Sequence, residues 1–323
     1  MKHELARYRW IVIVAAAAAV LPRLLPDRYA IHLAVMIGIN TIVALGLNLL
    51  MGYAGQVSLG QAAFVGVGAY ASAILSANMG ISPWFAMAAG VALSALIGAA
   101  VGVPLLKLRG HYLAMGTLGF GMIVHIVLVQ WESLTGGTIG IMSVPPLKIG
   151  GISFDSELKM YYLVAASVIV AMALAANIIN SRVGRAMRAV HGSEIAAEMS
   201  GVDTARYKLQ VFVLSAAMAG YAGSLYAHHT TYVHPDSFGF HYSIYLVVMV
   251  VIGGMASIGG AIFGAGAVTL IAEHLRSFEE FSTVAFGFIL VAIMVFLPAG
   301  LWRGTAEALR RLRRTAPTPG EEA

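Results

Sequence analysis

The segment SRVGRAMRAVHGSEIAAEMSG, residues 181–201, is a charged interruption between two long apolar runs. Ser193 is a suitable helix N-cap, because its hydroxyl can accept a hydrogen bond from an amide of the first helical turn. Helix-forming residues follow to Met199, and Gly201 then stands where a left-handed C-cap is expected. The segment therefore predicts a compact helix–turn–helix, with a second short helix beginning near Asp203.

Around this segment the composition is that of a membrane protein. Of the 323 residues, 59% are hydrophobic and 11% are charged, whereas soluble domains carry roughly 25% charged residues. A membrane-spanning helix needs about 20 mainly apolar residues. With that window the sequence predicts an all-α, polytopic membrane protein of about ten helices, of which the eighth and ninth are short and divided at Gly259-Gly260. The predicted spans are 10–25, 31–50, 61–78, 84–106, 112–131, 161–178, 209–228, 244–257, 260–275 and 281–300.

The positions of Lys and Arg indicate the orientation, since the cytoplasmic loops of membrane proteins carry an excess of these residues. With ten spans, all but five of the 20 basic residues fall on the side of the two termini and of segment 180–208. We therefore predict that both termini and this segment are cytoplasmic, and that the net charge of +5 reflects topology rather than nucleic-acid binding. The five exceptions are Arg23, Arg28, Lys148, Lys159 and Arg276.

The first apolar run, 10–21, has the length of a signal-peptide core. Pro22 and Arg23 follow it directly and another apolar run begins by Ile31, so we predict a retained first helix. The predicted divisions of the chain are a cytoplasmic tip with the first helix (1–30), a transmembrane domain (31–302) that contains the 180–208 loop, and a basic cytoplasmic tail (303–323).

The sequence carries no set of residues for catalysis. It has no Gly-x-x-x-x-Gly-Lys-Ser/Thr phosphate loop and no cysteine, and His228 and His229 stand at an outer helix end without metal-ligand companions. No Asp, Glu, Lys or Arg lies at the centre of a predicted span, whereas ion-coupled carriers usually bind charge at membrane depth. We therefore predict no catalytic residue, metal site or cofactor in this chain, and an energy source in a partner.

Segment 180–208 has two interpretations from its residues alone: a loop that joins two spans, or a helix that docks into a groove of another protein. It resembles the cytoplasmic EAA-type loop of ABC-importer permeases, which docks onto the ATP-hydrolysing subunit. Ala196, Ala197 and Gly201 match that pattern, whereas the Glu position holds Ile195 and the acid stands one residue earlier, at Glu194.

Longer strings resemble the LivH/LivM permease family of branched-chain amino-acid importers, and the LivM type in particular. The resemblance assigns ATPase coupling to Gly184, Arg185, Arg188, Glu194, Ala196, Ala197, Glu198 and Gly201. The strings that carry it are GRAMRAV (184–190), EIAAE (194–198), and the stretches 46–64, 108–120, 215–227 and 253–266.

This resemblance implies a bacterial inner-membrane permease for branched-chain or other hydrophobic amino acids. Its implied partners are a second homologous permease, two ABC ATPase subunits that bind ATP and Mg, and an outer substrate-binding protein. Permeases of urea and short-chain amide importers are very similar and stay open as an alternative. A secondary carrier that needs no ATPase is a further alternative.

Uncharged polar residues and glycines gather near the predicted helix breaks. Irregular backbone at membrane depth is tolerated where it is buried in protein or lines a cavity, and broken helices point to transport sites. The same residues can instead hydrogen-bond between helices or let helices pack closely, and both interpretations are open. The candidates for the pathway or a helix break are Asn40, Asn48, Gln56, Ser58, Gln61, His125, Gly253, Gly254, Ser257 and Gly259.

Overall fold

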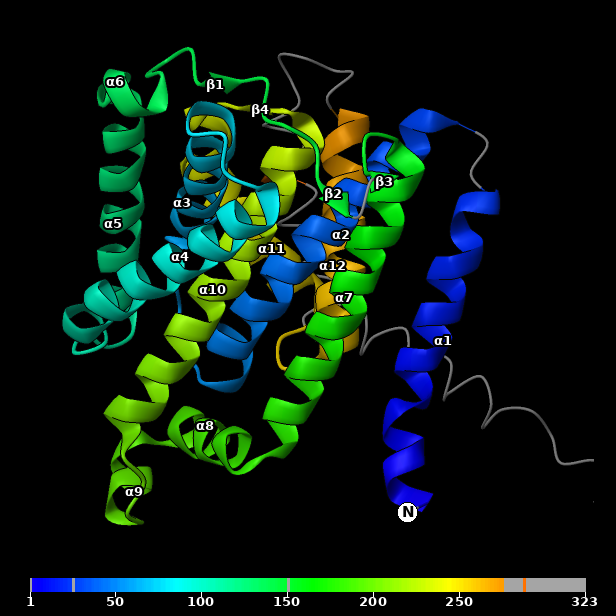
Figure 1. The fold of residues 1–323 in the computed structure, drawn as a ribbon. Helices are drawn as coiled ribbons and strands as arrows, with labels where there is room; N and C mark the ends of the chain where they lie inside the picture. The colour runs from blue at the N-terminus through cyan, green and yellow to red at the C-terminus, as the bar shows by residue number, and fades with distance from the viewer. Residues whose placement is uncertain (1, 25–26, 150–151, 276–286, 289–323) are drawn as a thin grey trace, which may run out of the picture.

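The computed structural model describes residues 2–24, 27–149, 152–275 and 287–288, most of which are helical (Figure 1). Two π-helical turns, η1 (Leu49–Tyr53) and η2 (Ile74–Asn78), extend α2 and α3, and a 3-10 turn, η3 (Pro235–Phe238), precedes α11. The helices are α1 (Lys2–Leu24), α2 (Arg28–Asn48), α3 (Gln61–Ala73), α4 (Pro83–Leu105), α5 (His111–Gln130), α6 (Glu132–Thr135), α7 (Glu157–Asn180), α8 (Arg182–Gly192), α9 (Glu194–Met199), α10 (Thr204–Thr230), α11 (Phe240–Gly253) and α12 (Ile258–Leu275).

The predicted all-α, polytopic membrane fold is confirmed. Within the described ranges, seven helical stretches are long and apolar enough to cross a membrane, and they contain α2, α4, α5, α7, α10, α11 and α12. α1 adds a shorter apolar stretch, Val12–Arg23, and α3 with η2 occupies the third predicted span, 61–78. The tenth predicted span, 281–300, and the tail 303–323 lie outside the described residues except for 287–288, so the total of ten stays a prediction.

The two ends of the bundle differ (Figure 1). One end, called here the α8–α9 end, carries these two helices and the N-terminus of α1. The opposite end, called the strand end, carries two short antiparallel pairs: β1 (Ile141–Met142) with β4 (Tyr232–Val233), and β2 (Lys148–Ile149) with β3 (Ile152–Ser153). The N-terminus therefore lies at the end that the charge distribution predicts to be cytoplasmic.

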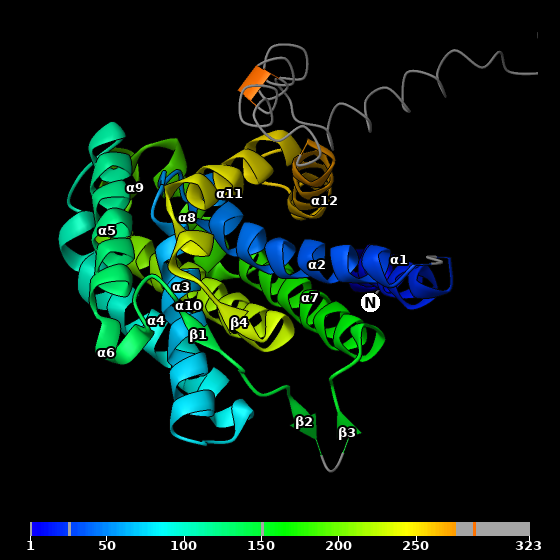
Figure 2. The same ribbon diagram turned by 90° about the horizontal axis from the view of Figure 1, so that it is seen from above.

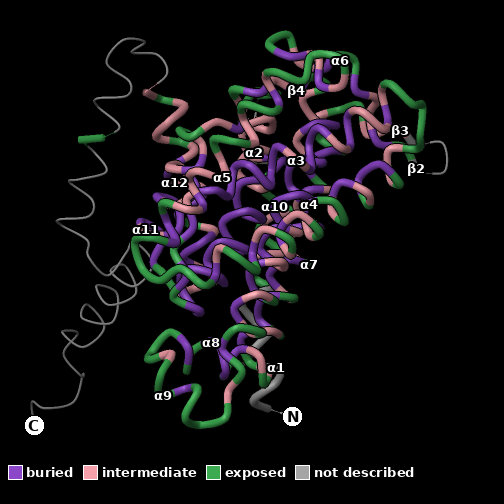
Figure 3. Tube along the Cα trace, turned by 90° about the vertical axis from the view of Figure 1, so that its left-hand side faces the viewer, coloured by how far each residue is buried: buried purple, intermediate pink, exposed green. Residues whose placement is uncertain are grey.

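Helices α2, α3 and α10 form the middle of the bundle, with α5 on one side and α1 on the other (Figure 2). Buried residues concentrate along these central helices (Figure 3). Small residues allow this packing, as they do in many membrane bundles. A Cβ atom on Gly68 would overlap the carbonyl oxygen of Gly220, and one on Gly223 would overlap that of Val65, so α3 and α10 touch backbone to backbone.

Two irregular segments interrupt the helices of the bundle, and the end of α2 with η1 packs against the second of them. The first, 54–60, follows η1, and the second, 254–257, separates α11 from α12. A Cβ on Gly52 would overlap the backbone nitrogen of Ala256. Asn48, the last residue of α2, ties this helix to the second segment, since its Nδ2 donates to the carbonyl of Ser257 at 2.8 Å and its Oδ1 accepts from the amide of Ala256 at 2.9 Å.

The predicted division at Gly259-Gly260 is wrong in position, because both glycines lie in the first turn of α12. The break begins at Gly254, whose φ of +110° strongly favours glycine. Gly260 instead serves packing: its carbonyl oxygen lies where a Cβ on Gly253 would stand. The expectation of a short helix beginning near Asp203 also needs correction, because Thr204 opens the 27-residue α10.

Replacing Asn48 by leucine, which has a similar volume, should destabilise the protein. The substitution leaves the half-buried amide of Ala256 and the carbonyl of Ser257 without these hydrogen bonds, and each group that stays unsatisfied costs about 1–3 kcal/mol. We expect a clearly lower melting temperature for N48L in detergent. The matched control is N180A, because the side chain of Asn180 donates to the carbonyl of Ala176 within its own helix. Equal stability of N48L and wild type would contradict the role of Asn48.

Candidate functional site

The segment 181–203 folds as a series of capped helix starts. The hydroxyl of Ser181 accepts from the amides of Val183 and Gly184 and opens α8, and that of Ser193 accepts from the amide of Ala196 and opens α9. Gly201 follows with φ of +81°, as the predicted left-handed cap requires. The N-cap expected at Ser193 is confirmed. Ser181 is a second N-cap, and this serine is the sequence signal that marks the start of α8.

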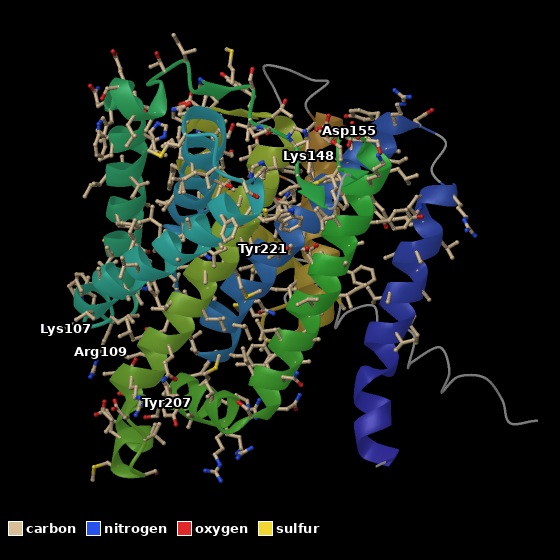
Figure 4. The ribbon with its side chains drawn as sticks, in the orientation of Figure 1. Lys107, Arg109, Lys148, Asp155, Tyr207 and Tyr221 are labelled. Atoms are coloured by element: carbon tan, nitrogen blue, oxygen red, sulfur yellow. The ribbon has the colours of Figure 1, made fainter. Side chains whose placement is uncertain are left out.

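Glu194, at the start of α9, is tied to three other parts of the chain. Its Oε1 lies 3.1 Å from Nζ of Lys208 on α10 and accepts from Nε2 of Gln56 at 3.4 Å. Its Oε2 lies 3.6 Å from Nε of Arg109, in the turn between α4 and α5. Figure 4 shows Arg109 and Lys107 at this turn, close to α9. The glutamate that stands one residue early in the loop pattern therefore anchors α9 to the bundle.

The Lys208 end of this ion pair is buried. The lysine side chain is 7% exposed and that of Glu194 is 19% exposed, and Nζ of Lys208 also donates to the carbonyl of Leu106 at 3.4 Å. A charge in such surroundings is stable only when it is paired and hydrogen-bonded. This requirement fixes the position of α9.

On its outward side α9 presents apolar residues. Ile195 and Met199, four residues apart on one helical face, are 65% and 87% exposed, whereas Ala197 is buried against the bundle. Glu198 accepts a hydrogen bond from the Thr204 hydroxyl at 2.6 Å, which ties α9 to the first turn of α10. The result is a firmly held helix with an uncovered apolar tip.

The other predicted coupling residues lie beside this tip. Gly184 packs against the last carbonyls of α7, where a Cβ would overlap the oxygen of Ile179, and Nη1 of Arg188 donates to the same carbonyl at 3.0 Å. Arg185 lines a cavity of about 530 Å³ together with Arg182 and Arg206. The structure thus brings all the predicted coupling residues together on the α8–α9 end.

Two of the predicted pathway residues, Asn40 and Gln61, make hydrogen bonds between helices. Asn40 on α2 donates to Thr269 on α12 at 3.0 Å and accepts from Tyr242 on α11 at 2.8 Å. Gln61 on α3 donates to the carbonyl and hydroxyl of Ser215 on α10, at 3.0 and 2.9 Å. With Asn48 already placed at the break, these amides hold the helices together.

Gly253, Gly254, Ser257 and Gly259 lie at the break between α11 and α12, and the other candidates lie on other segments. Ser257 accepts from the amide of Gly260 at the start of α12. His125 on α5 lies 3.6 Å from Asp236 near the strand end. Ser58 is buried in the segment after η1, and its hydroxyl has no hydrogen-bond partner within the described part of the chain.

A side-facing cavity of about 390 Å³ contains residues that the sequence reasoning missed. Helices α2, α4, α7 and α10 line it with mainly aliphatic side chains. Its polar groups are the hydroxyls of Ser167 and Tyr221, which are hydrogen-bonded to each other at 2.7 Å; Figure 4 shows Tyr221 at mid-height of the bundle. In the sequence, Ser167 and Tyr221 are distinguished from their neighbours by a hydroxyl group within an apolar span.

At the strand end the structure corrects the expectation for His229. His32 of α2 and Glu157 of α7 approach this histidine, and the ligand atoms of the three side chains all lie within 4.8 Å of one another. The neighbouring His228 has other contacts, with Ser72 at 2.8 Å and the carbonyl of Pro145 at 2.7 Å.

Comparisons with known proteins agree on one family. The model of the family described as branched-chain amino acid transport system / permease component matches residues 29–298. The high-affinity branched-chain amino acid transport system permease protein LivM of Salmonella typhimurium is 33% identical over 283 residues, and that of Escherichia coli K12 is 32% identical over 283 residues. Each match covers 80% of this chain and 66% of the relative, so the chain spans just under two thirds of these relatives.

A second type of relative matches less strongly. The corresponding permease protein LivH of Salmonella typhimurium is 29% identical over 254 residues, covering 73% of this chain and 82% of the relative. No solved structure matches the chain significantly.

Neutralising Glu194 should destabilise the α8–α9 end. In E194Q the buried ammonium of Lys208 loses its counter-charge, and breaking a buried ion pair from one side costs about 3–5 kcal/mol. We expect a lower free energy of unfolding in detergent and a partial recovery in the double variant E194Q/K208M, because the unpaired charge is then removed.

The control is E198Q on the same helix, because a glutamine there can still accept from Thr204. E198Q should resemble wild type. If E194Q lowers the free energy of unfolding no more than E198Q does, the ion pair does not hold α9.

Proposed function

The chain belongs to the branched-chain amino acid transport permease family, and we propose that it is the membrane subunit of an ATP-driven importer for branched-chain or other hydrophobic amino acids. It is a multi-pass protein of the bacterial cell membrane. The existence of two related permease types among its relatives, LivM and LivH, supports a second homologous permease as its partner. Two ABC ATPase subunits hydrolyse ATP, and a binding protein delivers the substrate at the strand end.

The observation that carries this proposal is the firmly anchored α9 with its uncovered apolar tip. An amphipathic helix docks by placing its apolar side chains in a groove of the partner, and Ile195 and Met199 are placed for that contact. The arginines around the adjacent cavity, Arg182, Arg185 and Arg206, add a basic border that complements an acidic surface.

The same anchoring provides a route for movement. A displacement of α9 acts through Glu194 on α10, on the turn between α4 and α5, and on Gln56. Gln56 belongs to the irregular segment after η1, and Asn48 connects the preceding helix with the break between α11 and α12. ATP-driven motion of the partner subunits would thereby reach helix breaks within the membrane domain.

Making the tip of α9 acidic should prevent docking without unfolding the permease. Both side chains of I195D/M199D point to solvent in the isolated chain, so the melting temperature should stay close to that of wild type. We expect the variant to lose most of its co-purification with the ATPase subunits. M142D is the matched control, because Met142 is 59% exposed at the strand end. ATPase subunits retained by I195D/M199D would contradict the docking role.

Transport itself is tested by assembling the chain with the second permease, ATPases and binding protein of its own organism in proteoliposomes. We expect uptake of labelled leucine that depends on ATP and on the binding protein. ATP-dependent uptake of urea or acetamide without leucine uptake would support the alternative importer class. Leucine uptake by the chain alone, without ATP, would establish a secondary carrier and refute the proposal.

A further inference from the structure

Three side chains that are distant in sequence meet at the strand end of the bundle. His32 lies in the second turn of α2, Glu157 is the first residue of α7, and His229 is near the end of α10. Nδ1 of His32 lies 3.1 Å from Nε2 of His229 and 3.4 Å from Oε1 of Glu157. The other carboxylate oxygen of Glu157 lies 3.8 Å from Nε2 of His229.

These separations suit a tetrahedral metal ion. Zn²⁺ binds histidine nitrogens and carboxylate oxygens at about 2.0–2.2 Å, and tetrahedral ligands at that distance are about 3.3 Å apart. The two separations from Nδ1 of His32, 3.1 Å to His229 and 3.4 Å to Oε1 of Glu157, lie around this value, and with one carboxylate oxygen as the ligand all three ligand atoms lie within 4.8 Å of one another. Two imidazoles and one carboxylate form a ligand set that zinc uses when a fourth position is left for water.

Hydrogen bonds alone do not satisfy this group. Nδ1 of His32 faces both the carboxylate and His229, yet a ring nitrogen carries at most one proton. If that proton is donated to Glu157, an unprotonated Nε2 of His229 can share it only as the second acceptor of a three-centre hydrogen bond. If Nδ1 accepts from His229, nothing is donated to Glu157.

Two parts of the group are buried, the His229 side chain and one oxygen of Glu157, and there this deficit is costly. The side chain of His229 is 3% exposed, and Oε2 of Glu157 is buried without a hydrogen-bond partner among the described residues. The nearby Lys159 does not supply the missing charge, because its Nζ pairs with Asp155 at 3.5 Å and donates to the carbonyl of Ser153 at 2.9 Å. One divalent cation would accept lone pairs from all three side chains and balance the carboxylate.

We propose that His32, Glu157 and His229 form a binding site for a divalent transition-metal ion of the Zn²⁺ class. The ion would connect the strand-end termini of α2, α7 and α10, two of which are central helices. The nitrogen ligands select such an ion over Mg²⁺ and Ca²⁺, which prefer oxygen ligands.

The test uses the full-length chain in detergent, purified without a histidine tag and treated with a chelator. Co²⁺ is added as a spectroscopic probe, followed by Zn²⁺ as a competitor and Mg²⁺ as a negative control. We expect one Co²⁺ per chain with visible absorption bands of a low-symmetry site, displacement by Zn²⁺ but not by Mg²⁺, and a melting temperature raised by several degrees with Zn²⁺.

The variant H32A removes one ligand and E157A removes another, and both wild-type side chains are partly exposed, at 40% and 36%; E157Q, which keeps an oxygen but loses the charge, is a milder change. H32A and E157A should each weaken Co²⁺ binding at least tenfold, because a metal site loses much of its affinity with each ligand. H241A is the control, since His241 is an exposed histidine outside the cluster, and it should bind as wild type does. The proposal would be overturned if wild type bound no Co²⁺, or if the ligand variants bound Co²⁺ as tightly as wild type.

Discussion

The carboxylate of Glu194 and the ammonium of Lys208 meet at 3.1 Å at the α8–α9 end, in surroundings that leave the lysine side chain only 7% exposed. Two charges removed from water are tolerated there only while they remain together. The pair therefore holds α9 against α10, and Gln56 and Arg109 bind the same carboxylate from two further segments. A docking helix that was free to tilt would move alone when a partner displaced it. Because α9 is anchored, its displacement is transmitted to the membrane helices.

The second constraint is the backbone within the membrane domain. Every amide and carbonyl that a broken helix frees must find a partner inside the protein, because lipid offers none. Asn48 provides two of these bonds at the break between α11 and α12, and the π-helical end of α2 places it one turn before the segment that contains Gln56. The ion pair and the helix break are thus connected through Gln56, the backbone of η1 and Asn48.

Periodicity and caps in the sequence predicted much of this arrangement. The apolar runs located the described spans, Ser193 located α9, and Gly201 located its end, because each of these signals depends on local backbone physics. The glycines around the break between α11 and α12 were less informative about where the helices end. Gly254 occupies a turn and Gly260 a packing contact, and residue identity alone does not distinguish the two uses.

Contacts between distant residues were beyond the reach of sequence spacing. Glu194 received its coupling role by resemblance, but its partners Gln56 and Arg109 come from other parts of the chain. The same holds for His32 and Glu157 beside His229, which no helical spacing relates. Such clusters become visible only when the helices are assembled.

The central claim is that α9 and the helix break between α11 and α12 move as one unit. Because the chain has no cysteine, spin labels can be placed on S200C, directly after α9, and on M255C in the break, both at exposed positions. Double electron–electron resonance on the assembled transporter, with and without nucleotide, measures the distance between them. We predict that this distance is the same with and without nucleotide in a transporter that carries out ATP-dependent uptake. A change of several ångströms between the states would contradict it.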